Sequence, residues 1–254
     1  MTKKNKKKTK KKASKKTSTS SIKLSMISII SFIVFSIGFI PLIVSVKLIL
    51  YVMTFDKILD FILLPFIITL ELLILLVSEL LISGVIIRVS NIKYTEGTYE
   101  YSVKNKIAFR WMLLCQLYTP IRKILEIIPM GRLGIVYLKL LGMKIGKNTL
   151  LGCTIKDPCV TEIGDNVTIG EYAILYAHIH NYEKETITIK KVRIENNCIV
   201  GAGAIIMPGV TMKENAVLGA GGLATKNRVL EKNKVYGGNP AKEIQIKKKT
   251  KEKV

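Results

Sequence analysis

The sequence predicts a mainly β protein in which two transmembrane helices and several short amphipathic helices precede a parallel β-helix. Two patterns in the 254 residues support this fold class. From residue 145 onward, aliphatic residues recur every six positions and are often followed by glycine. A period of six is not helical and not that of a simple hairpin strand, but it fits short strands separated by tight turns. Earlier in the chain, residues 24–46 and 61–89 form two long apolar runs.

Positive charge is concentrated at the two ends of the chain. The formal net charge is +22, and ten of the first sixteen residues are lysine. We expect residues 1–21 and 247–254 to be disordered basic tails, because this composition buries too little apolar surface to fold. Such tails are attracted to an anionic membrane surface. Nucleic acid is a disfavoured partner, since no helix-turn-helix, zinc or aromatic-platform pattern accompanies the lysines.

The two apolar runs predict a transmembrane hairpin over residues 22–89. Each run is long enough to cross about 30 Å of hydrocarbon as a helix. Gly38 and Pro41 mark the expected site of a kink in the first run, and Lys47 ends that run. A signal peptide is the alternative for the first run, but the run is too long and a second one follows at once.

Two acidic residues, Glu71 and Glu79, lie within the second run. Ionisable groups at this depth are costly and usually face a partner or water. Residues eight apart lie nearly in line on a helix, so the two carboxyl groups could form a functional pair on one face. Alternatively, the helix is buried against the first one or tilted toward the interface, and we favour this second interpretation.

The distribution of Lys and Arg predicts the orientation in the membrane. The lysine-rich tail precedes the first run, and five basic residues follow the second, namely Arg88, Lys93, Lys104, Lys106 and Arg110. Because positively charged flanks stay in the cytoplasm, both termini and the β-helix domain are predicted to be cytoplasmic in a multi-pass protein of the cell membrane. The four cysteines lack CxxC spacing and are interpreted as reduced, structural thiols.

Residues 90–144 are predicted to form a linker and short amphipathic helices. The stretch 96–99 is interpreted as a turn. From residue 105 to 141, aliphatic residues recur at helical spacing, and Pro120, Pro129 and Gly131 are expected to divide this stretch into short helices. These helices would lie in the membrane interface, cover the first coil of the β-helix, or do both.

The six-residue repeat runs in two frames over residues 145–246. The first frame contains Ile145, Leu151, Ile163, Ile169 and Leu175, and Asp157 interrupts it once. The second frame contains Ile194, Val200, Ile206, Met212 and Leu218. A loop is therefore inserted between the frames. We expect each aliphatic residue to point into a narrow core, since coils that cannot bury their own apolar side occur in stacks. A β-meander with chance glycine spacing is the less favoured alternative.

Several segments of this repeat resemble the hexapeptide-repeat acyltransferases. Residues 163–170, IGDNVTIG, are typical of that family, and residues 201–211, GAGAIIMPGVT, resemble its signature segment. Residues 236–242, YGGNPAK, resemble its closing motif, and residues 137–146 resemble the lead-in of membrane-attached members. The resemblance implies a left-handed parallel β-helix, whereas the usual crossover rule would predict the opposite hand. It also implies a homotrimer, with each site between two subunits.

Residues 218–226, LGAGGLATK, resemble the family segment that holds coenzyme A. The resemblance implies acetyl-CoA or another acyl-CoA as the donor, and no metal. Four positions match those that contact the carrier, namely Ala202, Ala220, Thr225 and Lys226. Small residues suit such a site because the cofactor must lie close to the backbone. Lys242 would meet phosphate or is a solvated surface lysine, and Gln245 stands where many relatives have Arg, which puts that contact in doubt.

His178 and His180 are the two histidines of the chain, and both lie at the start of the inserted loop. Acyl transfer needs a base for the proton of the acceptor, and histidine titrates near neutral pH. Residues 180–183, HNYE, resemble the family's catalytic His followed by an aromatic residue and a carboxylate, so we prefer His180. His178 remains the alternative, and both could instead be packing or surface histidines. Glu183 would orient the imidazole, touch the acceptor, or be solvated.

The leading interpretation is a membrane-anchored acyltransferase of the O- or N-type, in the simplest form an acetyltransferase. Its acceptor would be a sugar, an amino sugar or a lipid-linked molecule, a class that rests on the anchor and on the habit of the family. A zinc enzyme of the γ-carbonic-anhydrase type needs three His ligands, and this chain has two His. A non-catalytic, membrane-anchored oligomeric scaffold remains the alternative function.

Overall fold

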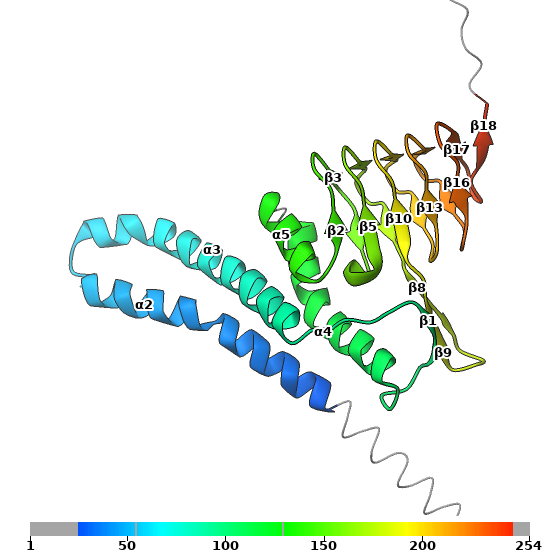
Figure 1. Cartoon of the computed structure of the whole chain (residues 1–254). Helices are drawn as coiled ribbons and strands as arrows, with labels where there is room; N and C mark the ends of the chain where they lie inside the picture. Colours follow the sequence, from blue (N-terminus) through cyan, green and yellow to red (C-terminus); the bar gives the residue numbers. More distant parts are fainter. Residues whose placement is uncertain (1–24, 54, 129, 246–254) are drawn as a thin grey trace, which may run out of the picture. The chain divides into compact units, whose positions relative to one another are not determined.

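The computed structural model describes residues 25–53, 55–128 and 130–245. These residues form two compact units (Figure 1). The helical unit contains the residues up to Lys93 together with Ser102–Leu140, and the β-helix unit contains Tyr94–Tyr101 together with the residues from Leu141 onward. The predicted basic tails, 1–21 and 247–254, lie outside the described residues.

Two long helices dominate the helical unit. One covers Ser25–Val52 and the other, α3, covers Ile58–Val89, and both are long and apolar enough to span a membrane. The first is interrupted at Phe39 and continues as α2 (Ile40–Val52), with Pro41 in the first turn of α2, so the predicted kink lies here. The helix does not end with the apolar run at Lys47, because Lys is a good helix former and continues the helix to Val52.

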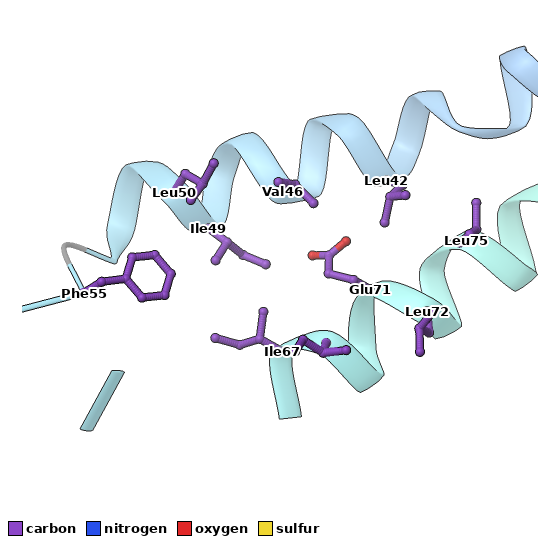
Figure 2. A pocket seen from close by; sticks show the side chains of 10 residues that line it. Leu42, Val46, Ile49, Leu50, Phe55, Ile67, Glu71, Leu72 and Leu75 are labelled. Atoms are coloured by element: carbon purple, nitrogen blue, oxygen red, sulfur yellow. The ribbon is translucent and has the colours of Figure 1, made fainter. Parts of the chain in front are cut away.

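Small and polar side chains mark the contact between the two long helices. Gly38 lies so close to the Glu79 carboxyl group that any side chain at Gly38 would clash with it. Ser78 donates a hydrogen bond of 2.7 Å to the Gly38 carbonyl, and Ser45 donates one of 2.7 Å to Glu71 Oε1. Figure 2 shows the Glu71 carboxyl group among aliphatic side chains of α2 and α3, in a cavity of about 320 Å³. Both carboxyl groups are buried, which agrees with the favoured interpretation.

Two further helices complete this unit. Asn105 caps α4 (Lys106–Ile127), where its Oδ1 accepts hydrogen bonds of 2.9 and 3.2 Å from two backbone N–H groups. The prediction that Pro120 ends a helix is wrong, since α4 continues through it. Buried apolar residues on both sides of Pro120 hold the two halves in one helix despite the lost hydrogen bond. Gly131, with φ of +51°, separates α4 from α5 (Arg132–Leu140), and Pro129 lies outside the described residues.

The β-helix unit consists of very short strands that stack coil upon coil (Figure 1). One sheet has the order β16-β13-β10-β5-β2, the second β18-β17-β14-β11-β6-β3, and the third β15-β12-β7-β4. Pairing is parallel throughout, except that β18 runs antiparallel to β17. The strands are β2 (Lys144–Ile145), β3 (Leu150–Leu151), β4 (Thr154–Ile155), β5 (Thr161–Ile163), β6 (Thr168–Ile169), β7 (Ile174–Leu175), β10 (Val192–Ile194), β11 (Ile199–Val200), β12 (Ile205–Ile206), β13 (Thr211–Met212), β14 (Val217–Leu218), β15 (Leu223–Ala224), β16 (Val229–Leu230), β17 (Val235–Gly237) and β18 (Lys242–Ile244).

The register of these sheets confirms the two predicted frames. Ile145, Ile163, Ile194 and Met212 stack on one another as direct neighbours in successive coils. Equivalent residues are 18 apart, which is three repeats, and 31 apart across the insertion. Members of the frames are buried on the inside, so the six-residue period fills one continuous core. Three parallel sheets around such a core are typical of the left-handed parallel β-helix, as predicted.

One corner of the coils is built by a column of asparagines. Asn148, Asn166, Asn197, Asn215 and Asn233 all have φ between 53° and 60°, in the left-handed region. Asparagine tolerates this conformation better than most residues with a side chain. The side-chain amides also bond to one another along the column, for example from Asn166 Nδ2 to Asn197 Oδ1 at 3.2 Å. The corner therefore fixes both the turn and the stacking of the coils.

The insertion between the two frames is a β-hairpin, not an irregular loop. Strands β8 (His178–Asn181) and β9 (Thr186–Ile189) pair antiparallel, and β1 (Gly97–Glu100) pairs antiparallel with the outer side of β9. Residues 96–99 therefore do not form the predicted turn, because the β9 edge offers unpaired backbone groups that β1 satisfies. The chain thus leaves the helical unit, adds one strand to the hairpin, and returns to the helical unit.

Candidate active site

The inserted hairpin places His178 against a buried carboxylate. His178 Nδ1 lies 2.7 Å from Asp157 Oδ2. The Asp157 side chain is fully buried, whereas 16% of the His178 side chain remains exposed. A fixed carboxylate on one ring nitrogen leaves the other nitrogen, Nε2, as the acceptor of the neutral imidazole. The pair therefore has the geometry of a general base whose tautomer is set by a carboxylate.

Three donors hold Asp157 in place. Besides His178, the Tyr94 hydroxyl donates to Oδ1 at 2.9 Å and the Ala177 N–H donates to Oδ2 at 2.9 Å. Burial alone would raise the pKa of Asp157, but the hydrogen bond and charge of His178, with the bonds from Ala177 and Tyr94, outweigh it and lower that pKa. The carboxyl group is therefore ionised and accepts every one of these bonds. The Thr161 hydroxyl donates to the Asp157 carbonyl at 2.8 Å and fixes the turn that follows.

His180 lies beside His178 in a group of aromatic rings. The two imidazole centroids are 5.4 Å apart, and the Tyr101 ring meets the His180 ring edge to face at 4.7 Å. Tyr182 stacks on His180 at 6.0 Å with an interplanar angle of 18°. Burial and the charge of His178 lower the pKa of His180, although Asp157 opposes this. The His180 imidazole is therefore neutral at neutral pH.

The predicted carboxylate partner, Glu183, lies elsewhere. It is exposed in the turn that joins β8 to β9, whereas the carboxylate in contact with a histidine is Asp157. In the sequence, Asp157 stands out only as a break in the repeat. A usable signal is nevertheless present, because Asp157 occupies an inward position of the first frame, where a carboxylate is buried and must be paired. Tyr94, far outside the repeat, carries no such signal.

The residues matched to the acyl carrier lie along the coils. Ala202 and Ala220 are exposed and sit at one corner on successive coils, where the Gly221 N–H donates to the Ala202 carbonyl at 2.8 Å. The coils approach so closely here that a side chain on Gly201 would clash with the Ala220 backbone. Small residues thus leave a flat corner against which an extended chain can lie next to the backbone.

The other three positions follow the C-terminal coils. Thr225 and the exposed Lys226 follow β15 directly, on the same coil as Ala220. Lys242 and Gln245 are exposed, and Lys242 begins β18 opposite Gly237. Lys226 and Lys242 are thus accessible to an anionic ligand as point charges.

The cysteines are chemically quiet. All four are free thiols. Burial raises the pKa of Cys159 and of Cys198 to about 11 each, and that of Cys153 to about 12. Since the thiolate is the nucleophilic form, these three thiols are unreactive at neutral pH. They lie within the β-helix unit as structural residues, in keeping with the sequence interpretation.

Comparison with known proteins places this site in context. The chain matches solved structures over its β-helix part at low identity. A hexapeptide-repeat acetyltransferase of Vibrio cholerae, solved alone and with acetyl coenzyme A, is 24% identical; the match covers 41% of this chain and 62% or 59% of that one, with TM-scores of 0.39 and 0.38. This chain thus spans about three fifths of that structure. A maltose O-acetyltransferase of Clostridium difficile is 19% identical, with 59% and 92% of the two chains covered and a TM-score of 0.46.

A galactoside acetyltransferase in complex with coenzyme A is also similar, with 21% identity, 49% and 78% of the two chains covered, and a TM-score of 0.38. The curated proteins contain no match to this chain. Residues 191–222 match the family model described as the hexapeptide repeat of succinyl-transferase. The match starts at the end of the inserted hairpin and covers the coils that carry Ala202 and Ala220. The coils of this protein are hexapeptide repeats, as its sequence predicted.

Proposed function

We propose that this protein is a membrane-anchored acyltransferase that moves an acyl group, in the simplest form acetyl, from acyl-CoA to a hydroxyl or amino group. The single observation that carries the proposal is the hydrogen bond between His178 and buried Asp157, at the one place where the coil is interrupted. A base in this position suits acyl transfer because the acceptor must lose a proton as it attacks the thioester.

In this mechanism His178 is the base, although the sequence alone favoured His180. Asp157 holds Nδ1–H, so Nε2 takes the proton from the acceptor as its oxygen or nitrogen bonds to the thioester carbonyl carbon. The negative charge of Asp157 stabilises the imidazolium that forms. When the tetrahedral intermediate collapses, the carbon–sulfur bond breaks and the imidazolium returns the proton to the coenzyme A thiolate. Glu183, exposed in the hairpin turn, is assigned no step.

The acyl carrier is proposed to lie along the corner formed by Ala202 and Ala220. Thr225 and Lys226 continue this line, with Lys226 and Lys242 placed to meet the phosphates of the nucleotide. The support is the absence of side-chain bulk at the corner and the match of these coils to the hexapeptide repeat. No metal has a role in the proposal, because neither the base nor the carrier needs one.

The proposed assembly is a homotrimer with a cytoplasmic β-helix unit. One face of the coils carries an outward row of aliphatic side chains, in which Leu150 is 66% and Ile199 49% exposed, and Val217 and Val235 follow them in register. Such a row is expected to be covered by another subunit. The two long apolar helices would anchor the chain in the cell membrane, with both termini in the cytoplasm.

Histidine substitutions test the proposal directly. In detergent-solubilised full-length protein, with acetyl-CoA and a panel of sugar and amino-sugar acceptors, His178→Ala should lower kcat about a hundred- to ten-thousand-fold. The KM for acetyl-CoA should change little, because the carrier is held on other coils. His180→Ala should cost much less. If the two losses are reversed, His180 is the base, and if the double variant keeps full activity, the mechanism is wrong.

A further inference from the structure

Tyrosine rings enclose the histidine pair on the hairpin. Tyr101 lies edge to face against His180 at 4.7 Å, and Tyr182 stacks on the same imidazole at 6.0 Å. A third ring, Tyr176, stands edge to face against His178 at 6.2 Å. An acceptor that reaches either imidazole must therefore lie against one or more of these rings.

The two rings around His180 are accessible. Tyr101 is 41% exposed and Tyr182 is 85% exposed, whereas Tyr94, in the same segment as Tyr101, is only 3% exposed. Aromatic side chains gain considerable free energy when they are covered, and the phenol hydroxyl keeps a polar tip at the edge of the ring. An exposed pair next to a candidate base is therefore a surface on which a ligand gains binding free energy.

The position of Tyr101 is set by the hairpin and not by the hexapeptide repeat. Its N–H donates to the Glu185 carbonyl at 2.7 Å, directly after the four paired residues of β1. Tyr182 is at the first position of the turn after β8. The two rings thus come from opposite ends of one small antiparallel sheet, and His180 lies between them in the sequence of ring contacts.

We propose that Tyr101 and Tyr182 form the acceptor subsite and that the acceptor presents a sugar ring to it. This inference rests on the proposed acyltransferase function and names the class of its acceptor. A pyranose has an apolar C–H face and a rim of hydroxyl groups. Its apolar face can cover the tyrosine rings, its rim can bond to the phenol hydroxyls, and one hydroxyl can reach the imidazole. A plain alkyl alcohol would cover the rings but leave these polar tips without a partner.

Acceptor kinetics test this subsite. With acetyl-CoA and methyl glycosides of hexoses and N-acetylhexosamines, Tyr101→Ala and Tyr182→Ala should each raise the KM for the glycoside about tenfold. The KM for acetyl-CoA should be unchanged. Tyr101→Phe and Tyr182→Phe keep the ring and should retain most of the affinity. Lys184→Ala, in the same exposed turn, is the matched control and should leave the glycoside KM unchanged. Normal glycoside KM values in both alanine variants would overturn the proposal.

A binding measurement separates this inference from the enzymatic proposal. Saturation-transfer NMR with the same methyl glycosides needs no turnover and should show contact with the wild-type protein and a loss of contact in Tyr101→Ala/Tyr182→Ala. If the wild type transfers acetyl but binds no glycoside, the acceptor class is wrong. If it binds glycosides through these rings but transfers no acyl group to any probe, the subsite stands and the acyltransferase function fails. Equal losses for 1-butanol and glycosides as acceptors would contradict the assignment to a sugar.

Discussion

Asp157 occupies an inward position at which the other members of its frame are aliphatic. A buried carboxylate is costly unless it is paired and fully hydrogen-bonded, and here three donors meet its two oxygens. The protein thus places a charged group in a narrow apolar core, and the group on the exposed side of that charge is His178. Such an arrangement is expected where the pair has a chemical role.

Asp157→Asn should inactivate the enzyme without removing the histidine. The amide has nearly the same shape, but it can donate to His178 Nδ1 and so favour the tautomer in which Nε2 carries the proton and cannot accept one. We expect kcat to fall about a hundred- to ten-thousand-fold with little change in the KM for acetyl-CoA. Steady-state kinetics of the full-length protein in detergent measure this, with thermal unfolding as the control for folding. Unchanged kcat in a folded variant would contradict the role of the pair.

Asn166 provides a second prediction at the residue scale, concerning stability. Its φ is 55°, and it bonds to both neighbours in the asparagine column. Asn166→Gly keeps the left-handed turn at no steric cost and loses only the side-chain bonds, whereas Asn166→Ala adds about 1 kcal/mol of backbone strain. The melting temperature, followed by circular dichroism, should therefore fall from wild type to the Gly variant and further to the Ala variant. The reverse order for Gly and Ala would show that the turn is not strained.

At the scale of elements, the sheet formed by β2, β5 and β10 carries a charge cluster on its outer face. Glu162 on β5 lies between Lys144 on β2 and Arg193 on β10, at 2.9 and 3.2 Å, and Lys191 also reaches it at 3.1 Å. Burial alone would raise the pKa of Glu162, but the hydrogen bonds of Lys144, Lys191 and Arg193 and the charge of Lys191 lower it to about 2. Direct cross-strand neighbours of opposite charge thus stabilise the stacking of three coils.

This cluster predicts a pH-dependent contribution to stability. A carboxylate whose folded pKa is depressed from 4.5 to about 2 stabilises the folded state above pH 4.5, and this contribution is lost as the pH falls from 4.5 toward 2. Glu162→Gln should therefore destabilise the protein at pH 7 by about 1 kcal/mol, a value that high salt reduces. The difference between variant and wild type should shrink below pH 4 in thermal unfolding. A difference that is constant with pH would mean that the ion pairs contribute nothing.

The inserted hairpin is the other element on which the site depends. The hexapeptide coils supply Asp157, but β8 supplies both histidines and β1 supports β9 from a distant part of the chain. Tyr94 and Tyr101 flank β1, one bonded to Asp157 and the other packed on His180. The segment 94–101 is therefore part of the candidate site, although its sequence resembles an ordinary linker.

At the scale of the whole molecule, the two long apolar helices and the distribution of basic residues predict a defined topology. A cysteine at Lys57, between the two helices, should react with a membrane-impermeant maleimide added to intact cells. Lys93→Cys, after the second helix, is the matched control and should react only after the membrane is permeabilised, as should the wild-type protein with its own four thiols. Labelling of the Lys93 variant but not the Lys57 variant from outside would invert the proposed topology.

The sequence by itself determined the hexapeptide core. A six-residue period is a local pattern, and each aliphatic residue in it needs only the equivalent residues one coil away, so the frames of Ile145 and Ile194 follow from the spacing of the aliphatic residues alone. The two apolar helices and the kink near Pro41 follow in the same way from composition and from the chemistry of proline. Pro120 shows the limit of such reasoning, since tertiary packing kept α4 continuous where local preference predicted an end.

Only the tertiary structure decided how the candidate site is put together. The bond from Tyr94 to Asp157 joins residues 63 positions apart, and β1 pairs with a strand some ninety residues later, as the bond between Thr98 and Thr188 shows. No period in the sequence encodes such pairings, because they depend on which strand edge and which buried charge happen to be adjacent after the coils have stacked. The choice between His178 and His180 depends on the same fact, since the two side chains are chemically identical and only their surroundings in the fold distinguish them.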